Sequence, residues 1–82
     1  MKENIKFLES LGFVSLNSNP NLDHFYMTKH SNDVYMDAQG GKDYIQIRLI
    51  GLKHIEDEFE IEEVDEDSLK RIKDKINEWE NY

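Results

Sequence analysis

The chain has 82 residues, with 18 acidic and 10 basic side chains and a formal net charge of −8 at pH 7. This length holds one hydrophobic core, so we expect a single domain over residues 1–82. The lack of cysteine excludes disulfides and thiolate metal sites. The lack of a basic stripe argues against direct binding to a nucleic-acid backbone.

The charge is concentrated in one stretch. Residues 54–67 carry nine carboxylates and no lysine or arginine. The opening MKENIKFLES lacks the apolar run of a signal peptide, and no later run reaches the ~20 apolar residues of a membrane span. We therefore expect a complete cytoplasmic protein that begins at Met1, without contact to a membrane.

The first element is a predicted helix over residues 2–11, because Ile5, Leu8 and Leu11 recur at helical spacing. Gly12 supplies the left-handed residue that commonly closes a helix. Phe13 is then placed to contact Leu8, as in a Schellman-type helix end.

Four short strands follow, separated by turn-forming segments. NSNPN, HSND and QGGKD combine the residue types that favour turns. Ile45, Ile47 and Leu49 alternate with polar residues and make the last of these strands the clearest. The strands are predicted over residues 13–17, 22–29, 34–38 and 44–50.

The acidic stretch also alternates, with Ile55, Phe59 and Ile61 on one side and glutamates on the other. Period two is typical of a half-buried strand. A hairpin with a loop of about three residues, Leu52–His54, joins it to the preceding strand. The register that keeps the apolar side chains together pairs Ile47 with Phe59, Ile45 with Ile61, Arg48 with Glu58 and Gln46 with Glu60.

A second helix is predicted after Val64, with Asp65 as its N-cap. Val64 and Leu69 are spaced as a hydrophobic staple. Apolar residues then recur on one face at Leu69, Ile72, Ile76 and Trp79. Two ion pairs are expected along this helix, Glu66 with Lys70 and Asp67 with Arg71.

These elements predict an α+β fold of two layers: an N-terminal helix, a four- to five-stranded antiparallel meander sheet and a C-terminal amphipathic helix. Both helices are amphipathic, and the sheet has one apolar face. We expect the helices to cover that face.

The glutamates of the fifth strand are the first candidate binding surface. Carboxylates have low strand propensity, and a row of like charges repels itself. The row consists of Glu56, Glu58, Glu60 and Glu62, with Asp57 and Glu63 as an extension. Protection of an edge strand from aggregation, or simple solubility, is the ordinary explanation. Helix capping already accounts for Asp65, Glu66 and Asp67.

The tyrosines form an alternative interface. Tyr26, Tyr35 and Tyr44 share the face away from the helices if the second to fourth strands are neighbours. Exposed tyrosines are common at protein interfaces. The ordinary explanation is that they cover the second face of a small sheet.

No motif predicts catalysis, a metal or a cofactor. His24, His30 and His54 lack ligand spacing, and DEDSLK lacks the glycine of an EF-hand loop, which leaves only loose association with magnesium or calcium. No serine lies in a nucleophile motif, and QGGK lacks the spacing of a phosphate loop. We therefore expect a protein that is not an enzyme.

The layout resembles that of small uncharacterised phage and prophage proteins of bacteria. The residues that carry the resemblance are LGF after the first helix (Leu11–Phe13) and KINEW near the end (Lys75–Trp79). The resemblance implies a product in the bacterial host cell that acts on host machinery. Together with the acidic stretch, it favours an inhibitor of a nucleic-acid enzyme, of anti-defence or immunity type. A structural or assembly module that uses the tyrosine face is the alternative.

Overall fold

The structure, a computed structural model, describes residues 2–16, 23–31 and 34–81. It contains two helices and five strands: α1 (Lys2–Ser10), β1 (Val14–Ser15), β2 (Phe25–Ser31), β3 (Val34–Gly40), β4 (Ile45–Ile50), β5 (Ile55–Ile61) and α2 (Glu66–Glu80). No helix among these residues is long and apolar enough to cross a membrane.

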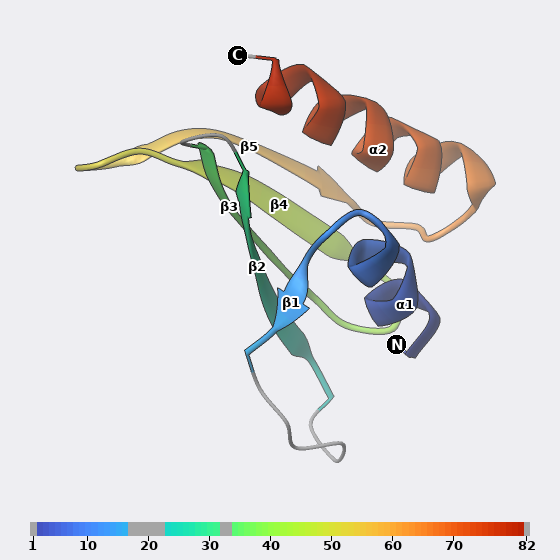
Figure 1. Cartoon of the computed structure of the whole chain (residues 1–82). Helices are drawn as coiled ribbons and strands as arrows, with labels where there is room; N and C mark the ends of the chain where they lie inside the picture. Colours follow the sequence, from blue (N-terminus) through green and yellow to red (C-terminus); the bar gives the residue numbers. More distant parts are fainter. Residues whose placement is uncertain (1, 17–22, 32–33, 82) are drawn as a thin grey trace.

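The predicted α+β fold is confirmed. The strands form one antiparallel sheet in the order β1-β2-β3-β4-β5, so each strand pairs with its neighbour in the sequence. Both helices lie on the same side of this sheet (Figure 1). The protein is therefore a small single domain of two layers, with one sheet face covered and the other uncovered.

The core lies between the helix layer and the covered face of the sheet. Its side chains come from both helices, from Phe13 after α1 and from strands β2 to β5. The buried hydrophobic residues are Leu8, Phe13, Phe25, Met27, Met36, Ala38, Ile45, Ile47, Leu49, Ile61, Ile72, Ile76 and Trp79.

α1 ends in the predicted Schellman arrangement. Gly12 adopts φ +100°, and the N–H of Phe13 donates to the carbonyl of Leu8 at 3.0 Å. The N–H of Gly12 donates to the carbonyl of Glu9, also at 3.0 Å. Leu8 and Phe13 are both buried in the core, so the turn fixes the direction in which the chain enters β1.

Asn4 connects α1 to the hairpin between β3 and β4. Its side-chain amide is buried and donates to the carbonyl of Gly41 at 2.9 Å and to that of Lys42 at 3.2 Å. These carbonyls lie in the hairpin between β3 and β4. The bonds therefore hold the start of the chain against a turn 37 residues later in the sequence.

The first three strands differ from their predicted bounds at the ends. β1 has two residues instead of the five expected, and the predicted NSNPN turn lies outside the described residues. β2 begins at Phe25 and continues through His30 to Ser31, so half of the predicted HSND turn is strand. Cross-strand pairing with β3 extends these strands beyond the point where local alternation weakens.

The predicted register between β4 and β5 is confirmed at all four pairs, including Ile47 with Phe59 and Arg48 with Glu58. The loop prediction is wrong in detail. The N–H of Gly51 donates to the carbonyl of His54 at 2.8 Å, which leaves two residues at the turn.

A β-bulge in β5 compensates for the shorter turn. Leu49 pairs with Asp57 and Ile50 with Ile55, so Glu56 has no partner on β4. The bulge moves Ile55 to the uncovered face, opposite Ile50, where it is 44% exposed. The prediction that Ile55 shares the buried side with Phe59 is therefore wrong.

α2 begins as predicted, with Asp65 as N-cap. The Asp65 backbone is extended, and its Oδ1 accepts from the N–H of Ser68 at 2.8 Å. Val64 and Leu69 both pack against the core, as expected for a staple. The two expected ion pairs do not form within 4.0 Å; Arg71 instead donates to the hydroxyl of Ser68 at 3.2 Å.

The cap at Asp65 leads to a pH-dependent prediction. Replacement of Asp65 with alanine should lower the melting temperature by about 4–8 °C at neutral pH, while asparagine should retain most of the cap. The hydrogen bonds from Ser68 hold the pKa of Asp65 below its usual 3.8. A lowered pKa stabilises the fold above pH 3.8, and this contribution is lost as the pH falls through the lowered value.

Thermal unfolding of the natural chain, Asp65→Ala and Asp65→Asn between pH 2 and pH 7 would test this. The gap between the natural chain and Asp65→Ala should narrow in acid. An equal gap at all pH values would mean that the charge of Asp65 does not contribute.

Candidate functional site

The uncovered face of the sheet carries most of the predicted site residues. Residues that pair directly across antiparallel strands point to the same face. Three rows of side chains therefore cross this face from β2 to β5. They are Tyr26, Gln39, Gln46 and Glu60; Thr28, Asp37, Arg48 and Glu58; and His30, Tyr35, Ile50 and Ile55.

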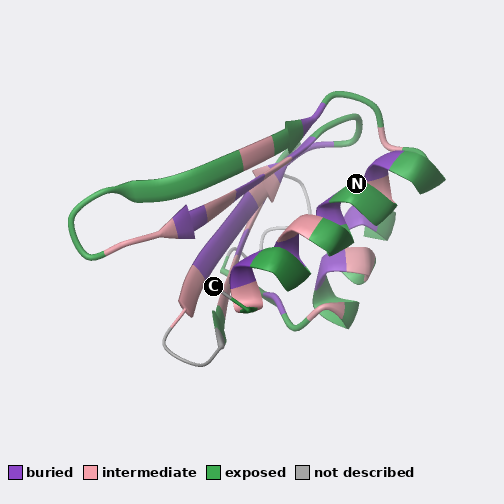
Figure 2. Ribbon diagram, turned by 90° about the horizontal axis from the view of Figure 1, so that it is seen from above, coloured by how far each residue is buried: buried purple, intermediate pink, exposed green. Residues whose placement is uncertain are grey.

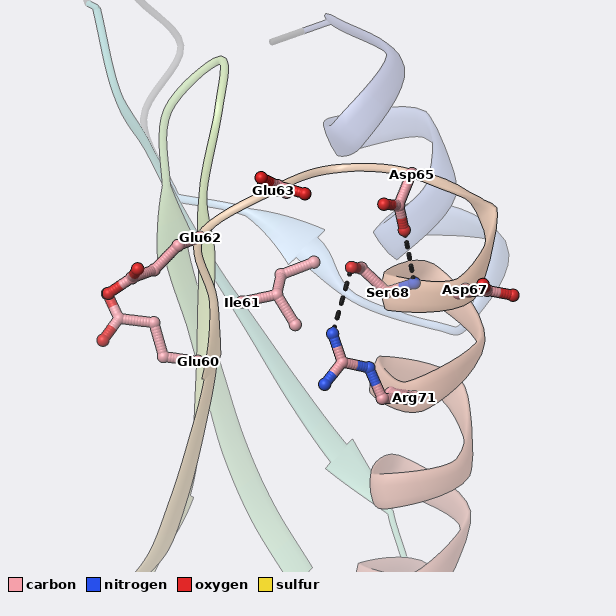
Figure 3. A pocket seen from close by; sticks show the side chains of 8 residues that line it. All are labelled: Glu60, Ile61, Glu62, Glu63, Asp65, Asp67, Ser68 and Arg71. Atoms are coloured by element: carbon pink, nitrogen blue, oxygen red, sulfur yellow. Dashed lines mark hydrogen bonds between the residues drawn. The ribbon is translucent and has the colours of Figure 1, made fainter.

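β5 forms one edge of the sheet and is exposed along most of its length (Figure 2). Glu58 and Glu60 lie on the uncovered face at this edge. Glu62 follows the strand, and Figure 3 shows its carboxylate next to that of Glu60, with both pointing away from α2. These three residues, Glu58, Glu60 and Glu62, are called the acidic row below.

The remaining predicted acidic residues lie elsewhere. Glu56 sits in the bulge, with its carboxylate 3.4 Å from Nε2 of His54. Glu63 lies in the connection to α2 and is exposed. Neither belongs to the acidic row.

Asp57 lies on the opposite, helix-facing side of β5. Its Oδ2 accepts from Nε1 of Trp79 at 3.1 Å and lies 3.4 Å from Nζ of Lys75. The bond from Trp79, the backbone N–H of Glu58 and the charge of Lys75 lower the pKa of Asp57. Asp57 therefore anchors α2 to β5, and its carboxylate is engaged within the protein.

The residue that sequence reasoning missed is Asp37, which is only 1% exposed although it lies on the uncovered face. Its Oδ1 accepts from Nε of Arg48 at 2.8 Å, and its Oδ2 accepts from Nη2 of the same guanidinium. The hydroxyl of Tyr26 donates to Oδ2 at 2.8 Å. We call Asp37, Arg48 and Tyr26 the central network.

The central network raises the pKa values of Arg48 and Tyr26. The hydrogen bond to Asp37 is the main cause of the raised pKa of Arg48, and it also raises the pKa of Tyr26, with burial as a further cause. Arg48 therefore remains a cation and Tyr26 a hydrogen-bond donor at neutral pH. Asp37 pairs with Arg48 in the β3–β4 register. The QGGKD turn sets that register. The position of this turn is therefore the feature of the sequence that could have indicated the Asp37–Arg48 pair.

The central network leaves the acidic row without a cation. Arg48 lies directly opposite Glu58, but its guanidinium is held by Asp37. Among the described residues, no lysine, arginine or histidine lies within 4.0 Å of the carboxylates of Glu58, Glu60 or Glu62. Three adjacent negative charges are thus available to a partner.

Tyr26 and Tyr35 lie on the uncovered face without forming a cluster. Tyr26 and Tyr35 are four residues apart in register, about 13 Å along the strands. Tyr35 packs against His30 with ring centroids 4.4 Å apart, while Tyr44 is exposed at the start of β4. Two of the three predicted tyrosines, Tyr26 and Tyr35, therefore lie on the same face as the acidic row.

A pocket of about 670 Å³ opens between the end of β5 and the start of α2 (Figure 3). Its lining is Glu60, Ile61, Glu62, Glu63, Asp65, Asp67, Ser68 and Arg71. Arg71 is the one cationic side chain in this lining. No group of three or more histidine or carboxylate side chains among the described residues is arranged to hold a metal ion.

The uncovered face thus combines a hydrogen-bonded centre with a free acidic edge. A further hydrogen bond, between the side chains of Gln39 and Gln46, connects β3 to β4 beside the central network.

Comparison of the chain with protein-family models, curated protein sequences and solved structures finds no match.

Proposed function

We propose that this chain is a non-catalytic inhibitor that binds the basic surface of a nucleic-acid enzyme in a bacterial host, in the manner of an anti-defence or immunity protein. The observation that carries the proposal is the free acidic row beside an occupied arginine. Arg48 is the cation that pairs with Glu58 across the sheet, and Asp37 holds its guanidinium. The negative edge is therefore not neutralised by its own fold.

The physical basis of such binding is electrostatic. An enzyme that grips nucleic acid presents a groove lined with lysine and arginine, because it must neutralise phosphates. A row of carboxylates on a rigid strand can occupy that groove. Complementary charge accelerates association, and the effect weakens as salt screens it.

The apolar side chains at the other edge of the same face favour a second function, assembly. Val14 pairs with Thr28 on the uncovered face, and the N–H of Leu16 donates to the carbonyl of Tyr26 at 2.9 Å. Val14 is 63% exposed and Leu16 is 59% exposed. An assembly module that uses these residues and the tyrosines would bind in a salt-insensitive manner.

Charge reversal separates the two functions. The double variant Glu58→Lys/Glu60→Lys should weaken binding to a basic partner by at least about tenfold at low salt. The control Glu9→Lys/Asp74→Lys makes the same change in net charge at exposed positions on α1 and α2, and it should bind normally. Affinity capture from a bacterial lysate identifies the partner, and titration of the purified pair at low and high salt measures the effect.

Both variants must show cooperative thermal unfolding before they are compared. Equal weakening by the two pairs would mean that net charge, rather than the acidic row, drives binding. Binding that is unaffected by salt and by either double variant would favour assembly through the tyrosine face.

A further inference from the structure

β5 leaves one long edge of the sheet unpaired. β1, at the other edge, has two residues, whereas β5 has seven. Both views place β5 at the rim of the sheet, with α2 over the covered face rather than beside the strand (Figures 1 and 2). An unpaired strand of this length can pair with another chain.

The register shows which backbone groups point outward. The N–H of Gly41 donates to the carbonyl of Tyr44, and hydrogen-bonded pairs alternate along antiparallel strands. Gln46 and Arg48 therefore direct their backbone groups toward β3, and Ile47 directs its groups toward β5. On β5, the residues that bond back to β4 are Asp57, Phe59 and Ile61.

Glu58 and Glu60 consequently direct their backbone N–H and C=O away from the sheet. The N–H of Glu58 donates to Oδ1 of Asp57 at 2.9 Å. Among the described residues, the backbone of Glu60 makes no hydrogen bond outside the sheet. Glu60 therefore offers both a donor and an acceptor to an added strand, and Glu58 offers an acceptor.

The side chains at the same positions select the occupant. A second copy of β5 laid along this edge would place glutamates beside glutamates, and like charges across strands are destabilising. A strand with lysine or arginine at alternate positions would instead face Glu58 and Glu60 with opposite charge. The acidic row thus opposes self-pairing and favours a basic strand.

A pocket lies beside this end of β5, on the side of the helix layer. Glu60, Ile61 and Glu62 form its wall on β5, and Asp65 and Asp67 lie across it at the start of α2 (Figure 3). A side chain directed toward the helix layer at this end of β5 would enter the pocket. Figure 3 shows the guanidinium of Arg71 directed into this gap and the carboxylates of Glu60 and Glu62 directed away from α2, so the selection for a basic strand comes from the uncovered face.

From the outward backbone groups and the matching charge, we propose that β5 binds a basic, extended protein segment as a sixth strand of the sheet. This inference rests on the proposed function, because it specifies how the basic partner is held. Backbone hydrogen bonds to Glu58 and Glu60 set the register, and lysine or arginine side chains contact the acidic row.

The test uses the natural chain with a short synthetic peptide of alternating lysine and valine. Two N-methylated versions carry the methyl groups on one or the other set of alternate amides, so that each blocks one edge of the peptide. One version should bind at least about tenfold more weakly than the parent, and the other should bind as the parent does. The amide proton of Glu60 should exchange more slowly with solvent when the parent peptide is bound.

A peptide of alternating glutamate and valine serves as the charge control and should not bind. Equal binding by both N-methylated versions, an unprotected Glu60 amide in the complex, or no binding by the parent peptide would each overturn strand addition. These results would leave the proposed function standing, since that function is judged by the Glu58→Lys/Glu60→Lys reversal with the captured partner.

Discussion

Replacement of Trp79 with alanine is expected to lower the free energy of unfolding by about 3–5 kcal/mol. Trp79 lies near the end of α2, is 1% exposed and packs in the core. A domain of this length has a total stability of about 4–12 kcal/mol. The loss of one side chain therefore removes a large part of the stability, because it both creates a cavity and releases the end of α2 from the sheet.

Urea unfolding followed by circular dichroism measures this effect. Trp79→Phe is the matched control, because it keeps an aromatic ring in the core and loses the hydrogen bond to Asp57. It should cost less than half as much as alanine. If Trp79→Ala lowered the stability by less than about 1 kcal/mol, the docking of α2 would not depend on this residue.

The second large effect is expected at Asp37. Asp37→Ala should lower the free energy of unfolding by about 2–4 kcal/mol, because it removes the anion that holds Arg48 and accepts from Tyr26. This expected loss of stability lies toward the lower end of what is found when a buried ion pair is broken, because a quarter of the Arg48 side chain remains exposed. A freed Arg48 also lies opposite Glu58, so it should neutralise part of the acidic row and weaken partner binding.

A double-mutant cycle separates the pair from the packing of each residue. Asp37→Asn keeps the size of the side chain, and Arg48→Gln removes the charge while keeping a polar side chain. The double variant should cost less than the sum of the two single changes. Additive effects would show that Asp37 and Arg48 do not depend on one another. In that event the acidic row would be free for a reason other than the capture of Arg48.

Local patterns in the sequence predicted the helix ends and the β4–β5 register. Gly12 and Asp65 act through neighbours a few residues away, so the residue types alone indicate the hydrogen bonds. The register follows from alternation over Phe59 and Ile61, because a slip by one residue would bury glutamates. Asp57 is grouped with the acidic surface from the sequence alone, whereas in the structure its carboxylate faces α2 and accepts from Trp79.

The features that could not be predicted depend on contacts across the sheet. The bulge at Glu56 adds one residue to β5 and shortens the turn by one residue. A three-residue loop without a bulge would satisfy the same alternation of apolar and polar side chains. Burial of Asp37 requires Tyr26 and Arg48 to meet it from two different strands. Arg71 could bond to either Asp67 or Ser68 within one turn of helix, and the spacing does not distinguish them.

The strand order has a consequence for how the chain folds during synthesis. Each strand pairs with the one made just before it, so the hairpins are local in sequence and should form quickly. α2 leaves the ribosome after all five strands, yet it covers β5 and much of the core. Until it emerges, the nascent sheet displays an apolar surface, and the repulsion between newly made acidic edges helps to keep neighbouring chains apart.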